Sequence, residues 1–98
     1  MRVIARKTLR DFWEAGHADA EGPLSAWFAE AERAVWNSPN DIKVHYPSAS
    51  ILADDRVVFN IKGNTYRLIV AIKYKSHVVY IRFVGTHASY DKIDAGKV

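Results

Sequence analysis

The hydrophobic positions in the first part of the chain follow a helical period, after a short stretch that alternates. Residues 1–5 alternate apolar and polar side chains and predict a short strand. Thr8 and Asp11 resemble a capping box in type and spacing. An apolar face at i, i+3, i+4 and i+7 is made of Leu9, Phe12, Trp13 and Gly16. These signals together predict a first helix at about residues 8–17.

A second helix is predicted at about residues 23–36. Gly22 followed by Pro23 is a helix-start signal, because proline is favoured at the first helical position. The apolar face that follows consists of Leu24, Trp27, Phe28, Ala31 and Val35. Most aromatic residues of both helices are expected in the core, with Trp36 partly exposed and available to a partner. Beyond it, Pro and Asn residues predict a long connection without regular structure.

From Arg56 onward the period changes to two, which is typical of strands. A first strand covers residues 56–62, and Gly63 with Asn64 supplies a tight hairpin turn. The next strand is long, with two faces, one apolar (Tyr66, Leu68, Val70, Ile72 and Tyr74) and one mixed (Thr65, Arg67, Ile69, Ala71, Lys73 and Lys75). A third strand is predicted at residues 78–85, and residues 89–95 are expected to form a final helical turn or two.

The two periods together predict an α+β fold in a single domain spanning residues 1–98. An N-terminal strand joins the edge of an antiparallel sheet, two helices pack on one face of that sheet to bury its apolar side, and a short helix ends the chain. The other face is then left to polar residues. We expect a concave basic surface there, near His87 and Tyr90, formed by Asn60, Lys62, Arg67 and Lys73.

The amino-acid composition excludes several kinds of site. The 98 residues include no cysteine, which excludes disulfides, a Cys-ligated zinc and thiol catalysis, and which suits the cytoplasm. No stretch approaches the roughly 20 apolar residues that a membrane span requires, so no membrane association is expected. His17, His45 and His77 stand far apart in sequence without an i, i+4 pair, and we expect no metal site.

The charge of the chain is unevenly divided. Residues 1–55 contain six Lys or Arg against nine Asp or Glu, whereas residues 56–98 contain eight against two. The basic second part predicts a polyanionic partner such as nucleic acid. The alternative to a polyanionic partner is that these charges are simply scattered over the solvated surface.

The end of the third strand draws attention because an apolar run leads directly into a polar cluster, Gly85-Thr-His-Ala-Ser-Tyr-Asp. A rigid strand can present side chains that packing alone does not require. His87 can exchange a proton near neutral pH, and Tyr90 lies three residues later, at a spacing that puts both on one helical face. Asp91 is more readily an orienting partner or helix-start residue than a base.

Two segments make a family resemblance recognisable. Residues 59–70, FNIKGNTYRLIV, followed by residues 79–94, VYIRFVGTHASYDKID, resemble the HigB family of toxins, the RelE-like endoribonuclease halves of bacterial toxin-antitoxin systems. The order of strands and helices also matches over nearly the whole chain. The resemblance implies an enzyme that cleaves mRNA on the translating ribosome and that a cognate HigA-like antitoxin silences.

The resemblance also implies site residues. Arg67, His87 and Tyr90 match the positions that carry the chemistry in such folds: Arg67 for the phosphate, because its planar fork donates in a fixed geometry, His87 for proton transfer, and Tyr90 for the phosphate or for stacking a base. Lys62 stands where the family often has Gly, and Lys73 where it often has an acidic or neutral residue. For each of these lysines, the alternative is a residue that is particular to this chain and is not part of the catalytic set.

Alternatives remain for each of these residues. Arg67 could pair with an acidic residue, and Tyr90 could seal the core. Lys73, Lys75 and Arg82 are candidates for contact with the backbone of RNA or ribosomal RNA, or are plain solvated charge. For the whole protein, the alternatives are a non-catalytic RNA-binding module and a structural partner that only binds an acidic antitoxin. A small helix-turn-helix protein in the neighbouring reading frame would favour the toxin.

Overall fold

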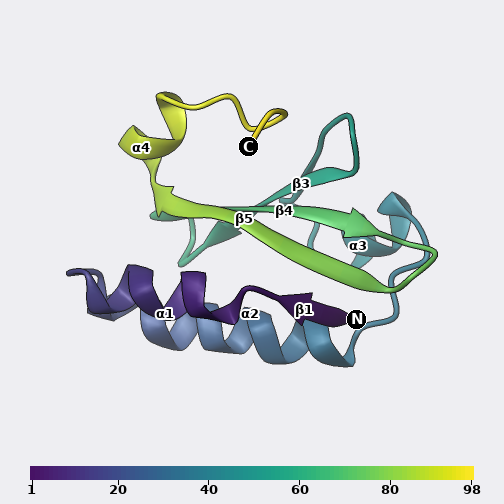
Figure 1. The fold of residues 1–98 in the computed structure, drawn as a ribbon, viewed down its shortest axis with the longest axis horizontal. Coiled ribbons are helices and arrows are strands. Elements are labelled where there is room, and N and C mark those ends of the chain that lie inside the picture. The colour runs from purple at the N-terminus through teal and green to yellow at the C-terminus, as the bar shows by residue number, and fades with distance from the viewer.

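The computed structural model describes residues 1–98 and has a five-stranded mixed sheet at its centre (Figure 1). The strands lie in the order β1-β5-β4-β3-β2. The strand β1 (Arg2–Ile4) runs parallel to β5 (Val78–Thr86). The remaining neighbours are antiparallel: β5 with β4 (Tyr66–Lys73), β4 with β3 (Arg56–Ile61), and β3 with β2 (Ser50–Ile51). The predicted antiparallel sheet and the N-terminal strand at its edge are confirmed.

Two N-terminal helices lie side by side beneath the sheet in Figure 1, as predicted: α1 (Arg6–Glu14) and α2 (Glu21–Arg33). Their bounds differ from the predicted ones. Helix α1 starts after Ala5, whose φ is 77°, and no side chain caps it, so the expected capping box is not formed. A 3₁₀ turn, η1 (Ala18–Ala20), precedes α2, so that Pro23 is the third residue of α2, still within the first turn where proline is tolerated.

The main core lies between these helices and the sheet. Leu9, Leu24, Trp27 and Ala31 of the helices pack against the lower face of the sheet, formed by Val57, Phe59, Leu68, Val70, Ile72, Val79 and Ile81. Burying each large aliphatic or aromatic side chain contributes about 1.5–3 kcal/mol. This contribution fixes the register of β3 and β4, because a slip by one residue would turn every one of these side chains to the opposite face.

The opposite face of the sheet is not bare. Val58, Ile69 and Ala71 point to that side and are also buried. The helix α4 (His87–Asp91) and the segment after it pass over this face in Figure 1, and the Arg56 Nε atom donates to the carbonyl of Val98 at 3.0 Å. The short C-terminal helix is confirmed. The polar surface on this face is smaller than we expected, because this segment covers part of it.

The connection after α2 is more ordered than predicted. It contains α3 (Pro39–His45) and the two-residue strand β2. Helix α2 ends at Arg33, and Trp36 lies beyond it with only 2% of its surface exposed, beside Phe59 and Tyr46. The expectation that Trp36 is the exposed tryptophan was therefore wrong. No helix of the structure combines the length and the apolar character needed to cross a bilayer.

Candidate functional site

Arg67 is the centre of a small polar cluster formed by three elements. It lies on β4 directly opposite Asn60 of β3, and its Nη1 atom donates to the Asn60 side-chain oxygen. The Arg67 Nε atom donates to the Nε2 atom of His87 at 3.2 Å. The Tyr90 ring lies against the same guanidinium, and the distance from the Arg67 Cζ atom to the centre of the ring is 5.3 Å. The structure thus brings Asn60, Arg67, His87 and Tyr90 together, and we refer to these four residues as the Arg67 site.

Local sequence explains how α4 presents two of these side chains. Thr86 ends β5 in an extended conformation, and its Oγ1 atom accepts a hydrogen bond from the backbone N–H of Ser89 at 3.2 Å. This is the N-cap interaction that starts a helix. His87 is then the first helical residue and Tyr90 the fourth, and residues three apart share one face of a helix. Both side chains therefore reach Arg67.

Gly85 lets this junction close tightly. It pairs with Arg67 across β4 and β5. A Cβ atom on Gly85 would lie 2.5 Å from the Phe83 Cζ atom and 3.2 Å from the Ser89 Cβ atom. Real Cβ contacts are longer, so no larger residue fits unless Phe83 or α4 moves. The glycine is required here by close approach and not by an unusual backbone conformation.

The electrostatics of the Arg67 site favour an anionic ligand. Arg67 has no carboxylate within ion-pair distance, so its charge is not neutralised by the protein, and the alternative of an acidic partner is not observed. Because Arg67 donates to His87 Nε2, that nitrogen accepts, which places the imidazole proton on Nδ1. Arg67, His87 and Tyr90 are all partly exposed and can be reached from solvent.

Lys62 is not part of this cluster, contrary to the expected basic surface. It lies in the turn between β3 and β4 with φ of 53°, a left-handed conformation that redirects its side chain. Its Nζ atom lies 2.6 Å from the Oδ2 atom of Asp19 in η1, and the Tyr66 hydroxyl donates to the other oxygen of Asp19. Hydrogen bonds from Lys62 and Tyr66 hold the pKa of Asp19 below its usual value. Nothing in the spacing of Asp19 indicated this role.

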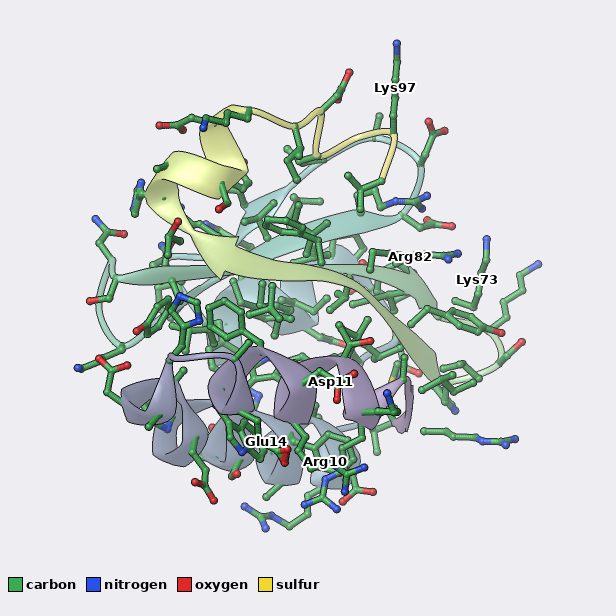
Figure 2. The ribbon with its side chains drawn as sticks, turned by 60° about the vertical axis from the view of Figure 1, so that its left-hand side comes forward. Arg10, Asp11, Glu14, Lys73, Arg82 and Lys97 are labelled. Carbon is green, nitrogen blue, oxygen red and sulfur yellow. The ribbon has the colours of Figure 1, made fainter.

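Lys73, Lys75 and Arg82 also lie apart from the Arg67 site, and we call these three residues the distal basic patch. Lys73 ends β4, six residues beyond Arg67, which is about 20 Å along a strand. Arg82 occupies a bulge, and its guanidinium leans over Tyr80, 5.7 Å from the ring centre. Figure 2 shows Lys73 and Arg82 on the side of the molecule away from α4. The predicted single concave surface was wrong in placing Lys73 beside His87.

The other three histidines have separate surroundings. His17 stacks on Phe12 with ring centres 4.1 Å apart, His45 lies 3.3 Å from a carboxylate oxygen of Glu30, and His77 contacts the side-chain oxygen of Asn37 at 2.9 Å. No three side chains of His, Cys, Asp or Glu are grouped so that they could hold a metal ion.

Comparison with known proteins gives consistent matches. Residues 20–93 match the model of a family described as HigB_toxin, the RelE-like toxic component of a toxin-antitoxin system. Three curated relatives are each 30% identical over 93 residues, covering 93% of this chain and 88% of the relative. They are the mRNA interferase toxin HigB of Escherichia coli K12 and the proteins named mRNA interferase HigB of Escherichia coli O157:H7 and Shigella flexneri.

Proposed function

Because this chain belongs to the HigB family of RelE-like toxins, we propose that it is an endoribonuclease that cleaves mRNA and thereby inhibits translation. The observation that carries the proposal is an arginine without a carboxylate partner, hydrogen-bonded to His87 and in contact with Tyr90. A pure RNA binder needs charge and stacking, but it has no need of a titratable ring held beside the phosphate-binding group. The domain spanning residues 1–98 would carry this activity in the cytoplasm.

The chemistry of RNA cleavage assigns a task to each side chain. A base removes the proton of the ribose 2′-hydroxyl, the 2′ oxygen attacks phosphorus, the bond to the 5′ oxygen breaks, and that oxygen takes up a proton. His87 supplies the base through Nε2, which becomes free when a substrate phosphate replaces it as the acceptor of the Arg67 Nε–H, because one lone pair cannot serve both. Arg67 stabilises the charge that develops on the phosphoryl oxygens. The departing 5′ oxygen takes its proton from solvent, so these steps are completed without a metal ion.

Asn60 and Tyr90 have supporting tasks. The side-chain oxygen of Asn60 fixes the guanidinium plane of Arg67 through the hydrogen bond between them. Tyr90 places one ring face against Arg67 and is partly exposed, so it is available to stack a nucleobase beside the scissile phosphate. Its hydroxyl is not required for that task.

The substrate and partners follow from the family and from the charge distribution. We propose that the mRNA is cut on the translating ribosome and that a HigA-like antitoxin controls the enzyme. The distal basic patch would contact the backbone of ribosomal RNA chiefly through Lys75 and Arg82, which belong to no ion pair, whereas the Lys73 Nζ atom lies 3.6 Å from a carboxylate oxygen of Asp55. Lys62 has no direct part in this proposal, since Asp19 already neutralises it.

Single-turnover cleavage of mRNA on programmed ribosomes tests the proposal. His87→Ala should cleave about 10² to 10⁴-fold more slowly than the wild type, which is the usual contribution of general base catalysis. The variant should remain folded and should still bind ribosomes, because His87 is partly exposed and lies outside the core. Arg10→Ala, which removes an exposed charge on α1, is the matched control and should keep the wild-type single-turnover rate. Cleavage by His87→Ala at the wild-type rate would refute the catalytic assignment, and an absence of cleavage by the wild type would favour a non-catalytic RNA-binding module.

A further inference from the structure

The side chain of Asn60 is held at both ends. Its oxygen accepts from Arg67, and its Nδ2 atom donates to the backbone carbonyl of Ser48 at 3.2 Å. An arginine can only donate and a carbonyl can only accept, so both neighbours require the same orientation of the amide. The terminal torsion of asparagine is broad. A hydrogen bond from Arg67 alone would leave the amide plane more freedom to turn, and the Ser48 carbonyl removes that freedom.

The bond between Asn60 and Arg67 becomes more important when RNA binds. In the proposed mechanism, the Arg67 Nε–H changes its acceptor from His87 to the substrate phosphate. The bond from Nη1 to Asn60 is then the remaining hydrogen bond between Arg67 and another side chain. Sheet pairing holds the two backbones opposite each other, but it does not fix the planes of the side chains. The orientation of Arg67 in the transition state therefore depends on what holds Ser48.

Ser48 lies in the short segment between α3 and β2, and Lys43 holds this segment. Pro47 and Ser48 are exposed, and neither makes a hydrogen bond between backbone groups. The Lys43 Nζ atom donates to the carbonyl of Pro47 at 2.7 Å and to that of Ala49 at 2.8 Å. Hydrogen bonds from a charged donor are roughly twice as strong as neutral ones. The carbonyls on both sides of Ser48 thus face the ammonium group, and the one between them faces Asn60.

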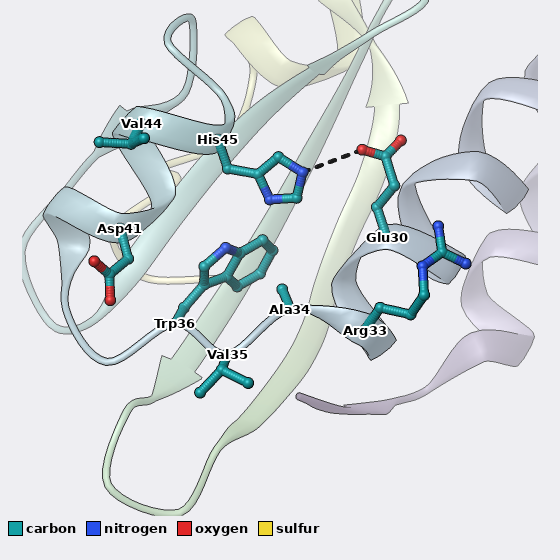
Figure 3. Close-up of a pocket in the computed structure, with 8 residues that line it drawn as sticks. All are labelled: Glu30, Arg33, Ala34, Val35, Trp36, Asp41, Val44 and His45. Carbon is teal, nitrogen blue, oxygen red and sulfur yellow. Dashed lines mark ion pairs between the residues drawn. The ribbon is translucent and has the colours of Figure 1, made fainter.

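Lys43 lies on a helix that is itself held in place. It belongs to the last turn of α3, whose Ile42 is fully buried. Figure 3 shows His45, at the end of α3, beside Glu30 of α2, with 3.3 Å between His45 Nε2 and Glu30 Oε2. The Tyr46 hydroxyl donates to the same oxygen at 3.0 Å. The helix is anchored to α2 and to the core, so the ammonium group has a rigid support.

A role as a plain helix cap does not account for these contacts. A lysine in the last turn of a helix often donates to carbonyls at the helix end, and the bond to Pro47 is of that kind. Ala49 lies beyond the end of α3 and directly before β2, so the second bond reaches across the whole segment. Lys43 forms no ion pair with a carboxylate. Its ammonium group is therefore used to hold the segment that carries Ser48.

We propose that Lys43 is a positioning residue of the nuclease, and that it fixes the guanidinium plane of Arg67 through the Ser48 carbonyl and Asn60. The proposal rests on the proposed function and adds to it a residue outside the Arg67 site. Lys43 does not touch the reacting atoms. Loss of its ammonium group would let residues 46–49 move and Asn60 turn, and a displacement of about 1 Å in a catalytic site slows a reaction by up to about 10²-fold.

Single-turnover cleavage of mRNA on programmed ribosomes tests the proposal, with ribosome affinity measured on the same preparations. Lys43→Met keeps the aliphatic stem and should cleave at least about ten-fold more slowly at saturating ribosomes, with affinity within about two-fold of the wild type, because positioning acts in the transition state. Lys43→Arg keeps charged donors for the two carbonyls and should recover most of the rate. Lys7→Met, which removes an exposed lysine from α1, is the matched control and should cleave like the wild type.

A double-mutant cycle with Asn60→Ala shows whether Lys43 acts through Asn60. Asn60→Ala should slow cleavage by itself, and Lys43→Met should then add little, because the two changes break the same connection. In nuclear magnetic resonance spectra, Lys43→Met should shift the side-chain amide signals of Asn60 and broaden the signal of the Arg67 Nε–H, whereas Lys7→Met should do neither. A lysine that only caps α3 would leave both signals unchanged.

The outcomes separate this role from the proposed function. Equal rates for Lys43→Met and the wild type would overturn the role of Lys43 and leave the nuclease intact. Equal slowing by Lys43→Met in the wild type and in Asn60→Ala would also overturn it, as would weaker ribosome affinity with an unchanged rate at saturation, which would make Lys43 an RNA contact. If Lys43→Met does not fold, Lys43→Gln, which keeps a polar end, takes its place in the same comparisons. Absence of cleavage by the wild type would overturn the proposed function and this role together.

Discussion

At the scale of single residues, Arg67 matters for its shape as much as for its charge. It uses one nitrogen for His87 and another for Asn60, while its guanidinium carbon lies over the Tyr90 ring. A lysine at this position would keep the charge, but an ammonium group has no rigid fork and cannot make the three contacts at once. The site therefore depends on a planar cation held in one orientation.

Arg67→Lys should consequently slow cleavage by about 10² to 10³-fold, the loss typical of removing one oriented donor from a transition state. Ribosome affinity at low salt should stay close to that of the wild type, because the net charge is unchanged. Single-turnover rates and a ribosome-binding titration on the same preparation check this. If Arg67→Lys cleaves within a few-fold of the wild-type rate, only the positive charge is needed and the planar shape of the guanidinium is not.

The positions of the residues of the Arg67 site can be predicted from the sequence, because two simple periodicities place them. Strand parity puts Arg67 on the face away from the core, and a spacing of three puts His87 and Tyr90 on one side of a helix. Lys62 was misplaced because its φ of 53° redirects the side chain, and parity holds only within a strand. Trp36 was misplaced because α2 ends three residues before it.

At the scale of elements, the junction between β5 and α4 is closely packed at Gly85. Gly85→Ala would place a methyl group against the Phe83 ring and Ser89. Overpacking of this kind costs about 1–3 kcal/mol, and it would move His87 and Tyr90 away from Arg67. We expect both a lower free energy of unfolding in urea and a loss of cleavage.

Gly22→Ala is the matched control for this prediction, because nothing lies within 4 Å of a Cβ atom at Gly22 in α2. Alanine in a helix should raise the free energy of unfolding by about 0.5–1 kcal/mol. Cleavage should be unchanged. If Gly85→Ala is as stable and as active as the wild type, α4 is not held by this contact.

The contact between η1 and the turn after β3 should make stability depend on pH. Lys62 and Tyr66 lower the pKa of Asp19 in the folded protein, so the ionised carboxylate stabilises the fold above its unfolded pKa, near 3.8. That contribution is lost as pH falls through the lower folded value. Asp19→Asn should therefore be less stable than the wild type between pH 5 and 7, with the difference shrinking below about pH 4.

Urea unfolding of both proteins across this range measures the effect, and Asp11→Asn serves as the control because Asp11 forms only an exposed pair with Lys7. If the free energies of unfolding of Asp19→Asn and the wild type differ by the same amount down to pH 3, the carboxylate charge is not what stabilises the contact.

The elements that the sequence does not predict are those with little hydrophobic periodicity. Helix α3 begins within Ser38-Pro39-Asn40, residues that usually interrupt structure, yet proline at the first helical position also starts a helix. Only Ile42 of this helix is buried, so it has no apolar stripe. Strand β2 has two residues, both exposed, and pairs with β3 through its backbone. Neither could be distinguished from a loop by hydrophobic pattern.

At the scale of the whole molecule, four of the eight Lys and Arg of residues 56–98 lie in the Arg67 site or the distal basic patch. Replacing Lys73, Lys75 and Arg82 together by alanine should reduce the dependence of log affinity for ribosomes on log salt by about 2, at roughly 0.7 per phosphate contact with single-stranded nucleic acid. Lys97→Ala with Lys92→Ala, on the C-terminal segment, is the control. An unchanged slope would mean that the distal basic patch is plain solvated charge.

The pairing of β1 with β5 also determines when the sheet can be completed. Arg2 pairs with Val78 and Ile4 with Tyr80, so the first strand has no partner until almost the whole chain has been made. Contacts between residues so far apart in sequence are slow to form. His87 and Tyr90 come later still. The sheet and the Arg67 site are therefore both completed only when residues 78–90 have been made, so that no shorter N-terminal piece of the chain contains the assembled site.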